Sequence, residues 1–587
     1  MTRRTFTAVL LVLVTFPCVV SGATRSVATK SPQLDRAMLA APSGTTVPTW
    51  VIFNSKLVTP AALSAADAAL TSHARARRER NLGAGHLVDA YDVPVSTAAI
   101  DAVRNSGAHV RQVSRWLNAV SVDATPDQIA AIAALPSVAR LDVVHAGRPP
   151  EPQPETSTPP REALRTPAQK LSYDYGSSFY QNFLIDVPPM HDLGYHGEGV
   201  IIAMLDTGVN NLGHPAFAGL NILAMHDFVN NDGTVSDQAG QMGSGYHGTL
   251  TLGAIAGFVP GELIGPAFGA TYVLAKTENT QWERHIEEDA WVAAAEWADS
   301  IGADIISSSL VYLGGFTNSE TGYAWQNMDG DTAIITIGAD LAASRGMLIV
   351  NAAGNSGFVS VPQNTLGAPA DGDMVLTVGA TDNQGIRASF SSVGNTTDGR
   401  TKPDVMAMGL GVYTVDPLST SYISATGTSL ACPLAAGAAA LVLQARPLSS
   451  NNMIMNALRN TATNHASPDR TYGWGVIDVL AARNAIPTGV AGSPPLPDAS
   501  LVAYPNPFNP ATTIDYDVAL AGRVTIAAYD AAGRRVATLV DEEQAAGPHS
   551  FTWNAADEHG GTLASGVYLL SLTAGQSHVS RKVVLLK

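Results

Sequence analysis

The sequence predicts an α/β protein, in which a parallel sheet is covered by helices on both faces and is flanked by a small α+β domain and a C-terminal β-sandwich. Near-continuous apolar runs in the middle of the chain, such as "GVIIAMLD" and "DMVLTVGA", alternate with amphipathic helical patterns. Strands that are apolar on both faces and are spaced by helices imply a parallel sheet with both faces covered. Two Pro-rich segments separate this block from its neighbours.

Size and composition indicate a globular protein of several domains. The chain has 587 residues, of which 46% are hydrophobic and 14% charged. This is enough apolar material for at least one large core. The formal net charge of −16, without a basic stripe, argues against nucleic acid as a partner.

The N-terminus has the pattern of a secretory signal peptide over residues 1–23. "MTRR" is followed by the short apolar run "AVLLVLVTF" and by small residues that end at Ala23. A lipoprotein anchor at Cys18 is the alternative, but the bulky Phe16 and Pro17 disfavour it. Cys18 would leave with the signal peptide, so Cys432 would have no partner for an intramolecular disulfide. We therefore expect a secreted or cell-surface protein.

The Pro-rich segments predict linkers at residues 148–170 and 487–500, and three folded blocks at 47–147, 171–486 and 501–587. In the first block, "TWVIFN", "WLNAVSVDA" and "ARLDVVH" are expected strands. The stretches "TPAALSAADAALTSHARARRER" and "TPDQIAAIAALPSV" are each expected to form one helix. This alternation indicates a small α+β domain, which by itself could be any small binding domain.

The middle block is expected to contain, in order, the strands "GVIIAMLD", "TYVLAK", "ADIISSSL", "GMLIVNAA" and "DMVLTVGA". Helices are expected over "EEDAWVAAAEWADSIG" and "TAIITIGADLAASRG". In the last block, runs such as "TTIDYDV", "RVTIAAYD" and "GVYLLSLTA" alternate in the β manner between Gly-rich turns, which indicates a β-sandwich. Sites in parallel sheets lie at the carboxyl ends of the strands.

Four polar residues of the middle block follow strands or begin helices. Asp206 closes an expected strand, His247 lies in "GYHGTLTLGAIAGF", Asn355 lies in "NAAGNSG" and Ser429 lies in "SATGTSLACP". Each alone is commonly a turn, capping or packing residue. Together they supply a hydroxyl nucleophile, a base, a carboxylate that orients the base and an amide donor for an oxyanion. The order Asp, His, Ser is that of the subtilisin arrangement.

On these motifs the middle block resembles the subtilisin family of serine proteases. "AMLDTGV", "HGT", "AAGNSG", "GTSLACPLAAG" and "KPDV" are similar to the family's motifs. The resemblance implies a catalytic triad of Asp206, His247 and Ser429, and an oxyanion hole built from Asn355 and the backbone N–H of Ser429. The sequence departs from the family at Tyr246, Leu250, Thr251 and Leu252, at Val311 in the place of a glycine, and at "VMAMG". These departures concern specificity more than activity.

The substrate is expected to bind as an extended strand beside residues 308–310 and 352–354. The residues that would line it are Ser308, Ser309, Leu310, Ala352, Ala353 and Gly354. Because backbone pairing is blind to sequence, the expected substrates are proteins and peptides in general. Catalysis would need no cofactor and no metal. The loop with Asp227, Asn230, Asn231, Asp232 and Asp237 could hold a structural calcium ion, although a solvated loop is favoured.

The flanking blocks then acquire expected roles. The first resembles the inhibitory propeptide of subtilisin-like zymogens, which would be the chain's own inhibitor and would be cut within the linker at 148–170. A permanent accessory domain is the alternative. The last block resembles C-terminal sorting domains that begin "YPNPFNP" and share the hook-capping Ig-like form. It implies export through the secretion machinery, and a plain Ig-like binding module is the alternative.

Two functions from different classes follow. The first is a secreted endopeptidase made as a self-processed zymogen. The second is a catalytically silent subtilisin-like surface binding protein, which would have no need of a propeptide. A lipase or esterase is disfavoured, because "GTSLA" lacks a glycine two residues after the serine and because the order of the three residues is different.

Overall fold

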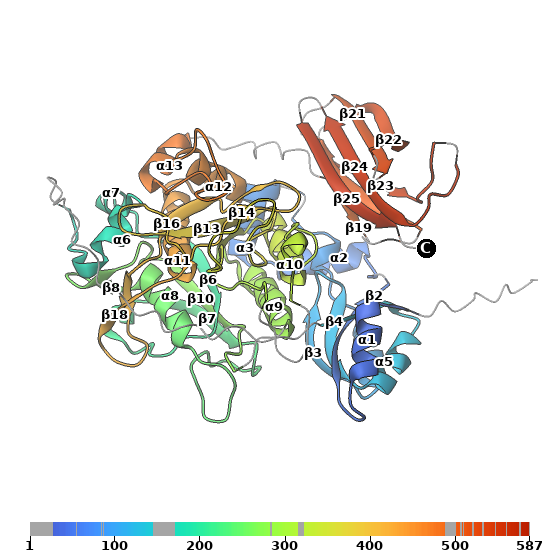
Figure 1. The fold of residues 1–587 in the computed structure, drawn as a ribbon, viewed down its shortest axis with the longest axis horizontal. Helices are drawn as coiled ribbons and strands as arrows, with labels where there is room; N and C mark the ends of the chain where they lie inside the picture. Colours follow the sequence, from blue (N-terminus) through green and yellow to red (C-terminus); the bar gives the residue numbers. More distant parts are fainter. Residues whose placement is uncertain are drawn as a thin grey trace, which may run out of the picture.

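The computed structural model describes residues 28–144, 171–314, 322–487 and 501–585, except 55, 84, 86, 282–284, 505–507, 509, 519–521, 531–532, 546, 559 and 575–576. The predicted signal peptide and the linker at 148–170 lie outside the described residues, as does nearly all of the linker at 487–500. Figure 1 shows the three blocks as an N-terminal part in blue, a large central part and a C-terminal part in red.

The N-terminal block is a five-stranded sheet with helices, in the strand order β1-β5-β2-β4-β3. Its strands are β1 (Thr29–Lys30), β2 (Val47–Phe53), β3 (His109–Ser114), β4 (Ala119–Ala124) and β5 (Val138–Val143). Its helices are α1 (Pro32–Ala40), α2 (Pro60–Ala69), α3 (Ser72–Leu82), α4 (Thr97–Arg104) and α5 (Pro126–Ala133). The core of this block includes Val51, Val120, Ile129 and Leu141, all fully buried.

One expectation for this block was wrong in detail. The single helix expected over "TPAALSAADAALTSHARARRER" is two helices, α2 and α3. The chain turns because Leu70 and Thr71 are extended, and the Thr71 hydroxyl accepts a hydrogen bond from Ala74 N, which begins α3. The turn lays α3 against the central block.

The central block is built on seven parallel strands in the order β16-β13-β12-β11-β6-β10-β7, which confirms the predicted fold class. The strands are β6 (Ile201–Asp206), β7 (Asn221–Asp227), β10 (Thr271–Lys276), β11 (Ile305–Ser308), β12 (Leu348–Ala352), β13 (Val375–Thr381) and β16 (Val405–Met408). The helices are α6 (Phe179–Phe183), α7 (Val187–Asp192), α8 (Tyr246–Ala256), α9 (Ile286–Ile301), α10 (Ile334–Ser344), α11 (Thr428–Ala445), α12 (Asn451–Asn460) and α13 (Val479–Ala485). Short strand pairs are β8 (Phe258–Val259) with β9 (Leu263–Ile264), β14 (Gly394–Asn395) with β15 (Thr401–Lys402) and β17 (Val412–Val415) with β18 (Tyr422–Ala425).

The two faces of the sheet contribute to two separate cores. In β6, Ile202 and Met204 pack in the core that contains α8 and α11. Their neighbours Ala203 and Leu205 pack in the core that contains α9 and α10. This alternation explains why β6 reads as a continuous apolar run, because both of its faces are covered.

Helix α11 combines length with apolar composition. Among the described residues it is the one helix that is long and apolar enough to cross a membrane, and 83% of it is buried inside the protein. Small residues at Ala435, Ala436 and Gly437 let the helix lie close to its neighbours. A β-carbon at Gly437 would lie 2.4 Å from Pro266 Cγ. Its burial identifies α11 as a core helix of the central block.

The C-terminal block has two antiparallel sheets, in the orders β19-β20-β23 and β22-β21-β24-β25. The strands are β19 (Leu501–Tyr504), β20 (Thr512–Val518), β21 (Gly522–Asp530), β22 (Arg535–Gln544), β23 (Gly547–Trp553), β24 (Gly566–Ala574) and β25 (Ser577–Leu585). Ile514, Ile526 and Leu570 are fully buried between the two sheets. This arrangement is the expected β-sandwich.

Candidate active site

The carboxyl edge of the large sheet brings Asp206 and His247 into contact. Asp206 ends β6, and His247 is the second residue of α8. His247 Nδ1 and Asp206 Oδ1 are 2.6 Å apart, with the Asp206 side chain 4% exposed and the His247 side chain 26% exposed. A buried carboxylate in this position holds one imidazole nitrogen and leaves the other to act on a neighbouring group.

Glycine is required where α8 approaches β6. A β-carbon at Gly248 would lie 2.0 Å from the carbonyl oxygen of Gly208, and one at Gly208 would lie 2.3 Å from that of Val235. Gly208 also has a φ of 99°, which disfavours other residues. The glycines of "DTG" and "HGT" therefore set the distance between the carboxylate and the imidazole.

Asp206 has further donors on the described residues around it. Its Oδ1 also accepts from Thr207 N at 2.7 Å, and its Oδ2 accepts from Thr251 Oγ1 at 3.0 Å. Thr251 is fully buried on α8, one turn after His247. In the sequence, Thr251 stands out only as a departure from the family's histidine motif. The signal that could have found it is a hydroxyl residue four positions after the histidine, on the same face of the helix.

Ser429 lies at the start of α11 and is 9% exposed. Its Oγ is 3.5 Å from the carbonyl oxygen of Ser309, and Ser309 Oγ donates to the carbonyl oxygen of Ser429 at 2.8 Å. The predicted nucleophile is thus tied to the segment that follows β11. A helix N-terminus favours negative charge near its free N–H groups.

Asn355 is held so that its amide nitrogen lies near the start of α11. Its Oδ1 accepts from Thr428 N at 2.9 Å and from Thr428 Oγ1 at 3.0 Å. A β-carbon at Gly427 would lie 3.6 Å from Asn355 Nδ2 and 3.6 Å from Ser429 N. Two N–H donors therefore border the same space beside Gly427, which is the arrangement that a developing oxyanion needs.

The residues predicted to line the substrate lie around this space and differ in burial. Ser308, Ala352 and Ala353 are fully buried. The Ser308 hydroxyl accepts from Trp291 Nε1 at 3.0 Å, beneath the sheet edge. Leu310 is 8% exposed, and Gly354 has a φ of 106° and donates its N–H to Thr428 Oγ1 at 3.2 Å. Any contact of the three buried residues with a substrate would have to be made by backbone atoms.

Cys432 lies one turn below Ser429 and is fully buried. Its thiol contacts the carbonyl oxygens of Ser308 and Val350, each at 3.4 Å. Burial raises the pKa of Cys432 to about 12, so the thiol stays neutral. A neutral buried thiol packs as a small apolar group and is inert as a nucleophile.

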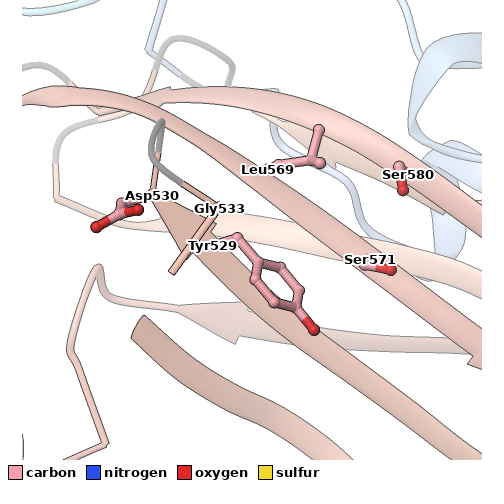
Figure 2. A pocket seen from close by; sticks show the side chains of 6 residues that line it. All are labelled: Tyr529, Asp530, Gly533, Leu569, Ser571 and Ser580. Atoms are coloured by element: carbon pink, nitrogen blue, oxygen red, sulfur yellow. The ribbon is translucent and has the colours of Figure 1, made fainter. Parts of the chain in front are cut away.

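A shallow pocket on the C-terminal sandwich has different chemistry. It has a volume of about 370 Å³ and is lined by Tyr529, Asp530, Gly533, Leu569, Ser571 and Ser580. Figure 2 shows these residues on β21, β24, β25 and the turn after β21. Among the described residues that line it there is no histidine, the usual base for a serine nucleophile.

The central block is similar in sequence to known proteins. Residues 197–475 match the model of the Subtilase family, Peptidase S8. Subtilisin DY of Bacillus licheniformis is 36% identical over 300 residues, which are 51% of this chain and 96% of the relative. Subtilisin NAT of Bacillus subtilis subsp. natto is 31% identical over 389 residues, which are 65% of this chain and 85% of the relative. The chain belongs to the subtilase family.

As a subtilase, the protein is a serine-type endopeptidase that acts on protein or peptide substrates. Residues 48–158 match the Peptidase S8 propeptide domain of Bacteroidota, so this subtilase carries its own propeptide. Residues 512–578 match the FlgD Ig-like domain. Among solved structures, a protease from Pseudoalteromonas arctica aligns with 54% of this chain and 99% of its own, at 25% identity and a TM-score of 0.42.

Proposed function

We propose that this subtilase hydrolyses peptide bonds through an acyl-enzyme, with Ser429 as nucleophile, His247 as general base and Asp206 as the group that orients the base. Ser429 lies in the first turn of α11. The observation that carries the proposal is the 2.6 Å contact between Asp206 Oδ1 and His247 Nδ1 at the carboxyl edge of the sheet. The imidazole thereby keeps Nε2 as the nitrogen that exchanges a proton.

In the proposed reaction, Ser429 Oγ attacks the carbonyl carbon while His247 takes the hydroxyl proton. The carbonyl oxygen becomes an oxyanion and accepts hydrogen bonds from Ser429 N and Asn355 Nδ2. The C–N bond then breaks, and His247 returns the proton to the departing amine. In the second half, His247 takes a proton from water, which attacks the ester carbonyl. The C–O bond to Ser429 then breaks, His247 returns the proton to Ser429 Oγ, and the acid leaves.

The substrate is proposed to lie as an extended strand along residues 308–310 and 352–354. Ser308, Ala352 and Ala353 would present backbone atoms, because their side chains are fully buried. Recognition through backbone atoms is independent of the substrate's side chains. A broad protein or peptide specificity follows.

The proposed chemistry needs no cofactor, and we propose that the loop after β7 is held by its own hydrogen bonds rather than by calcium. Asp227 is fully buried and lies 3.2 Å from Lys276 Nζ, so an ammonium group already stands beside its carboxylate. Asp232 accepts from Thr234 N at 2.7 Å, and Asp237 accepts from Gly245 N at 2.7 Å. In the described part of the chain, no three acidic, histidine or cysteine side chains form a group that could hold a metal ion.

We further propose that the protein is made as a zymogen, is exported by way of its N-terminal signal peptide and cuts itself in the linker at 148–170. The C-terminal Ig-like domain would engage the secretion machinery, and the mature enzyme would act outside the cell. The match of residues 48–158 to a propeptide domain supports the zymogen, and the match of residues 512–578 to an Ig-like domain is compatible with the role proposed for the C-terminal block.

The test is the intact mass of the purified protein beside its Ser429→Ala variant. We expect the wild-type chain to be cut between residues 148 and 170 and the variant to keep the linker intact. Two uncut proteins of equal thermal stability would contradict self-processing and would return the binding-protein alternative.

A further inference from the structure

The propeptide contacts the catalytic domain through α3. This helix carries the sequence "SHARARRERNL", and its Arg77 and Arg78 are fully buried. Arg77 and Arg78 pair with Asp299 near the end of α9, and His73 and Arg80 pair with Asp304, which precedes β11. We call these four side chains of α3 and their two carboxylate partners the arginine clamp.

The charges of the clamp are removed from water. The side chains of Asp299 and Asp304 are each 1% exposed. Arg78 Nη2 lies 2.8 Å from Asp299 Oδ2, and Arg80 Nη2 lies 2.6 Å from Asp304 Oδ1. Arg115 of the propeptide also reaches Asp299, at 2.8 Å. Removing one member of this buried cluster leaves the remaining charges less well compensated, which is unfavourable.

The clamp lies at the opposite edge of the sheet from the triad. Asp304 Oδ2 accepts from the N–H of Ile201, the first residue of β6, at 3.0 Å. Asp206 is the last residue of that strand. Five steps along a strand span about 17 Å, so the clamp is remote from the space beside Ser429. The helix α3 therefore binds without occupying the substrate path.

The backbone of the catalytic domain is also shaped to α3. A β-carbon at Gly302 would lie 2.9 Å from Ala74 N, and one at Gly346 would lie 2.8 Å from Asn81 Nδ2. Asn81 Oδ1 accepts from Asn451 N, in the first turn of α12, at 2.7 Å. Close packing and hydrogen bonding thus support the same position of α3 as the ion pairs do, and they involve other residues.

We propose that the acidic residues Asp299 and Asp304 form a docking site for the arginine-bearing helix α3, and that this site retains the propeptide on the catalytic domain after the linker has been cut. The inference rests on the proposed cleavage in the linker. The docking site lies remote from the active site. The cut end of the propeptide can therefore leave the substrate path while the rest of the propeptide stays bound.

The test uses the full chain in its Ser429→Ala form, with a recognition sequence for a site-specific protease placed in the linker at 148–170. After that protease cuts the linker, the dissociation constant of the propeptide is measured by co-elution over a dilution series. We expect Arg77→Met to weaken retention about tenfold to a hundredfold, because Asp299 loses a buried partner. The matched control is Arg104→Gln, whose side chain is 55% exposed and pairs with Asp101 of the same helix. Equal retention in the variant and the control would overturn the proposal.

Two further variants distinguish the loss of a docking contact from misfolding of the propeptide. Arg80 is 14% exposed, and Arg80→Gln removes one pair at the rim of the clamp with little change in packing. Asp299→Asn alters the catalytic domain instead of the propeptide and should weaken retention in the same direction. Because Ser429→Ala is present throughout, the result is independent of self-cleavage, which the intact-mass experiment judges separately. Unchanged retention in both variants, with unchanged thermal unfolding, would also overturn the docking site.

Discussion

At the scale of single residues, the hydroxyl of Thr251 makes a hydrogen bond in the site that the sequence did not predict. It donates to Asp206 Oδ2 at 3.0 Å, from the same helix that carries His247. We expect Thr251→Val to lower kcat roughly tenfold and to leave KM unchanged, because a hydrogen bond to a charged group contributes about 1.5–3 kcal/mol. Steady-state kinetics on a peptide substrate measure both constants.

Thr251→Ser is the matched control, since it keeps the donor and removes only a methyl group. It should recover most of the wild-type kcat. A valine variant as active as the serine variant would show that the bond to Asp206 does not matter for catalysis, and would point to the carbonyl oxygen of Gly248, 3.1 Å away, as the acceptor of this hydroxyl.

Asn355 is the second residue whose single amide carries a large expected effect. Its Oδ1 is held by Thr428, and its Nδ2 is the group left to meet an oxyanion. Asn355→Leu should lower kcat by roughly a hundredfold to a thousandfold with little change in KM, as for the loss of one oxyanion donor. Kinetics of the variant, with its thermal unfolding as the check on folding, measure this. A kcat within a few-fold of wild type would refute the assignment.

At the scale of elements, the packing of α8 sets the position of His247. A β-carbon at Gly253 would lie 2.3 Å from Thr414 Oγ1 and 2.9 Å from Val415 N, on β17. Gly253→Ala should therefore destabilise the protein by about 1–3 kcal/mol through overpacking, despite the better helix propensity of alanine. Urea unfolding in the Ser429→Ala background gives the free energy.

Gly219→Ala, in the turn before β7, is the control for this substitution, because a β-carbon there meets nothing within 4 Å and Gly219 has no positive φ that would strain an alanine. Its free energy of unfolding should equal that of the parent or exceed it slightly. Equal unfolding midpoints for the two variants would mean that α8 can shift away from β17 at no cost.

The loop after β7 yields a prediction about metal. Since Lys276 already lies beside Asp227, adding calcium should leave the thermal unfolding temperature of the Ser429→Ala protein unchanged, and so should a chelator. Differential scanning calorimetry with and without each reagent measures this. A rise in unfolding temperature with calcium that the chelator reverses would establish a calcium site.

At the scale of the whole molecule, Asp340 of α10 makes stability depend on pH. Burial and repulsion by Asp373 raise the pKa of Asp340 from 3.8 to about 7. The folded state therefore binds a proton that the unfolded state releases near pH 4, so this contribution to stability is full below that pH and is lost as pH rises through 7. We expect Asp340→Asn to flatten the decline in unfolding free energy between these pH values. Identical pH profiles for the two proteins would contradict this.

The local pattern of the chain predicted most elements near the site. Apolar runs predicted β6, β10, β11, β12 and β13. The proposed catalytic residues end or follow β6 and β12, or lie at the start of α8 and α11. The pattern predicted neither the start of α3 nor its burial. The helix is highly charged and has no apolar stripe that would indicate a buried face. Arg77 and Arg78 are buried because carboxylates pair with them, and Asp299, which pairs with both, lies more than 200 positions away in the chain.

Local periodicity was enough to predict the parallel sheet with both faces covered, which the structure confirms. The bounds of the three blocks and the residue types of the proposed site are predictions from composition and short motifs. Three contacts became visible only in the tertiary structure. Thr251 donates to Asp206, the Ser308 hydroxyl accepts from Trp291, and α3 docks at the sheet edge opposite the proposed triad. These are contacts between segments distant in the chain or between faces of an element. Their energy comes from desolvation and pairing, which no local pattern records.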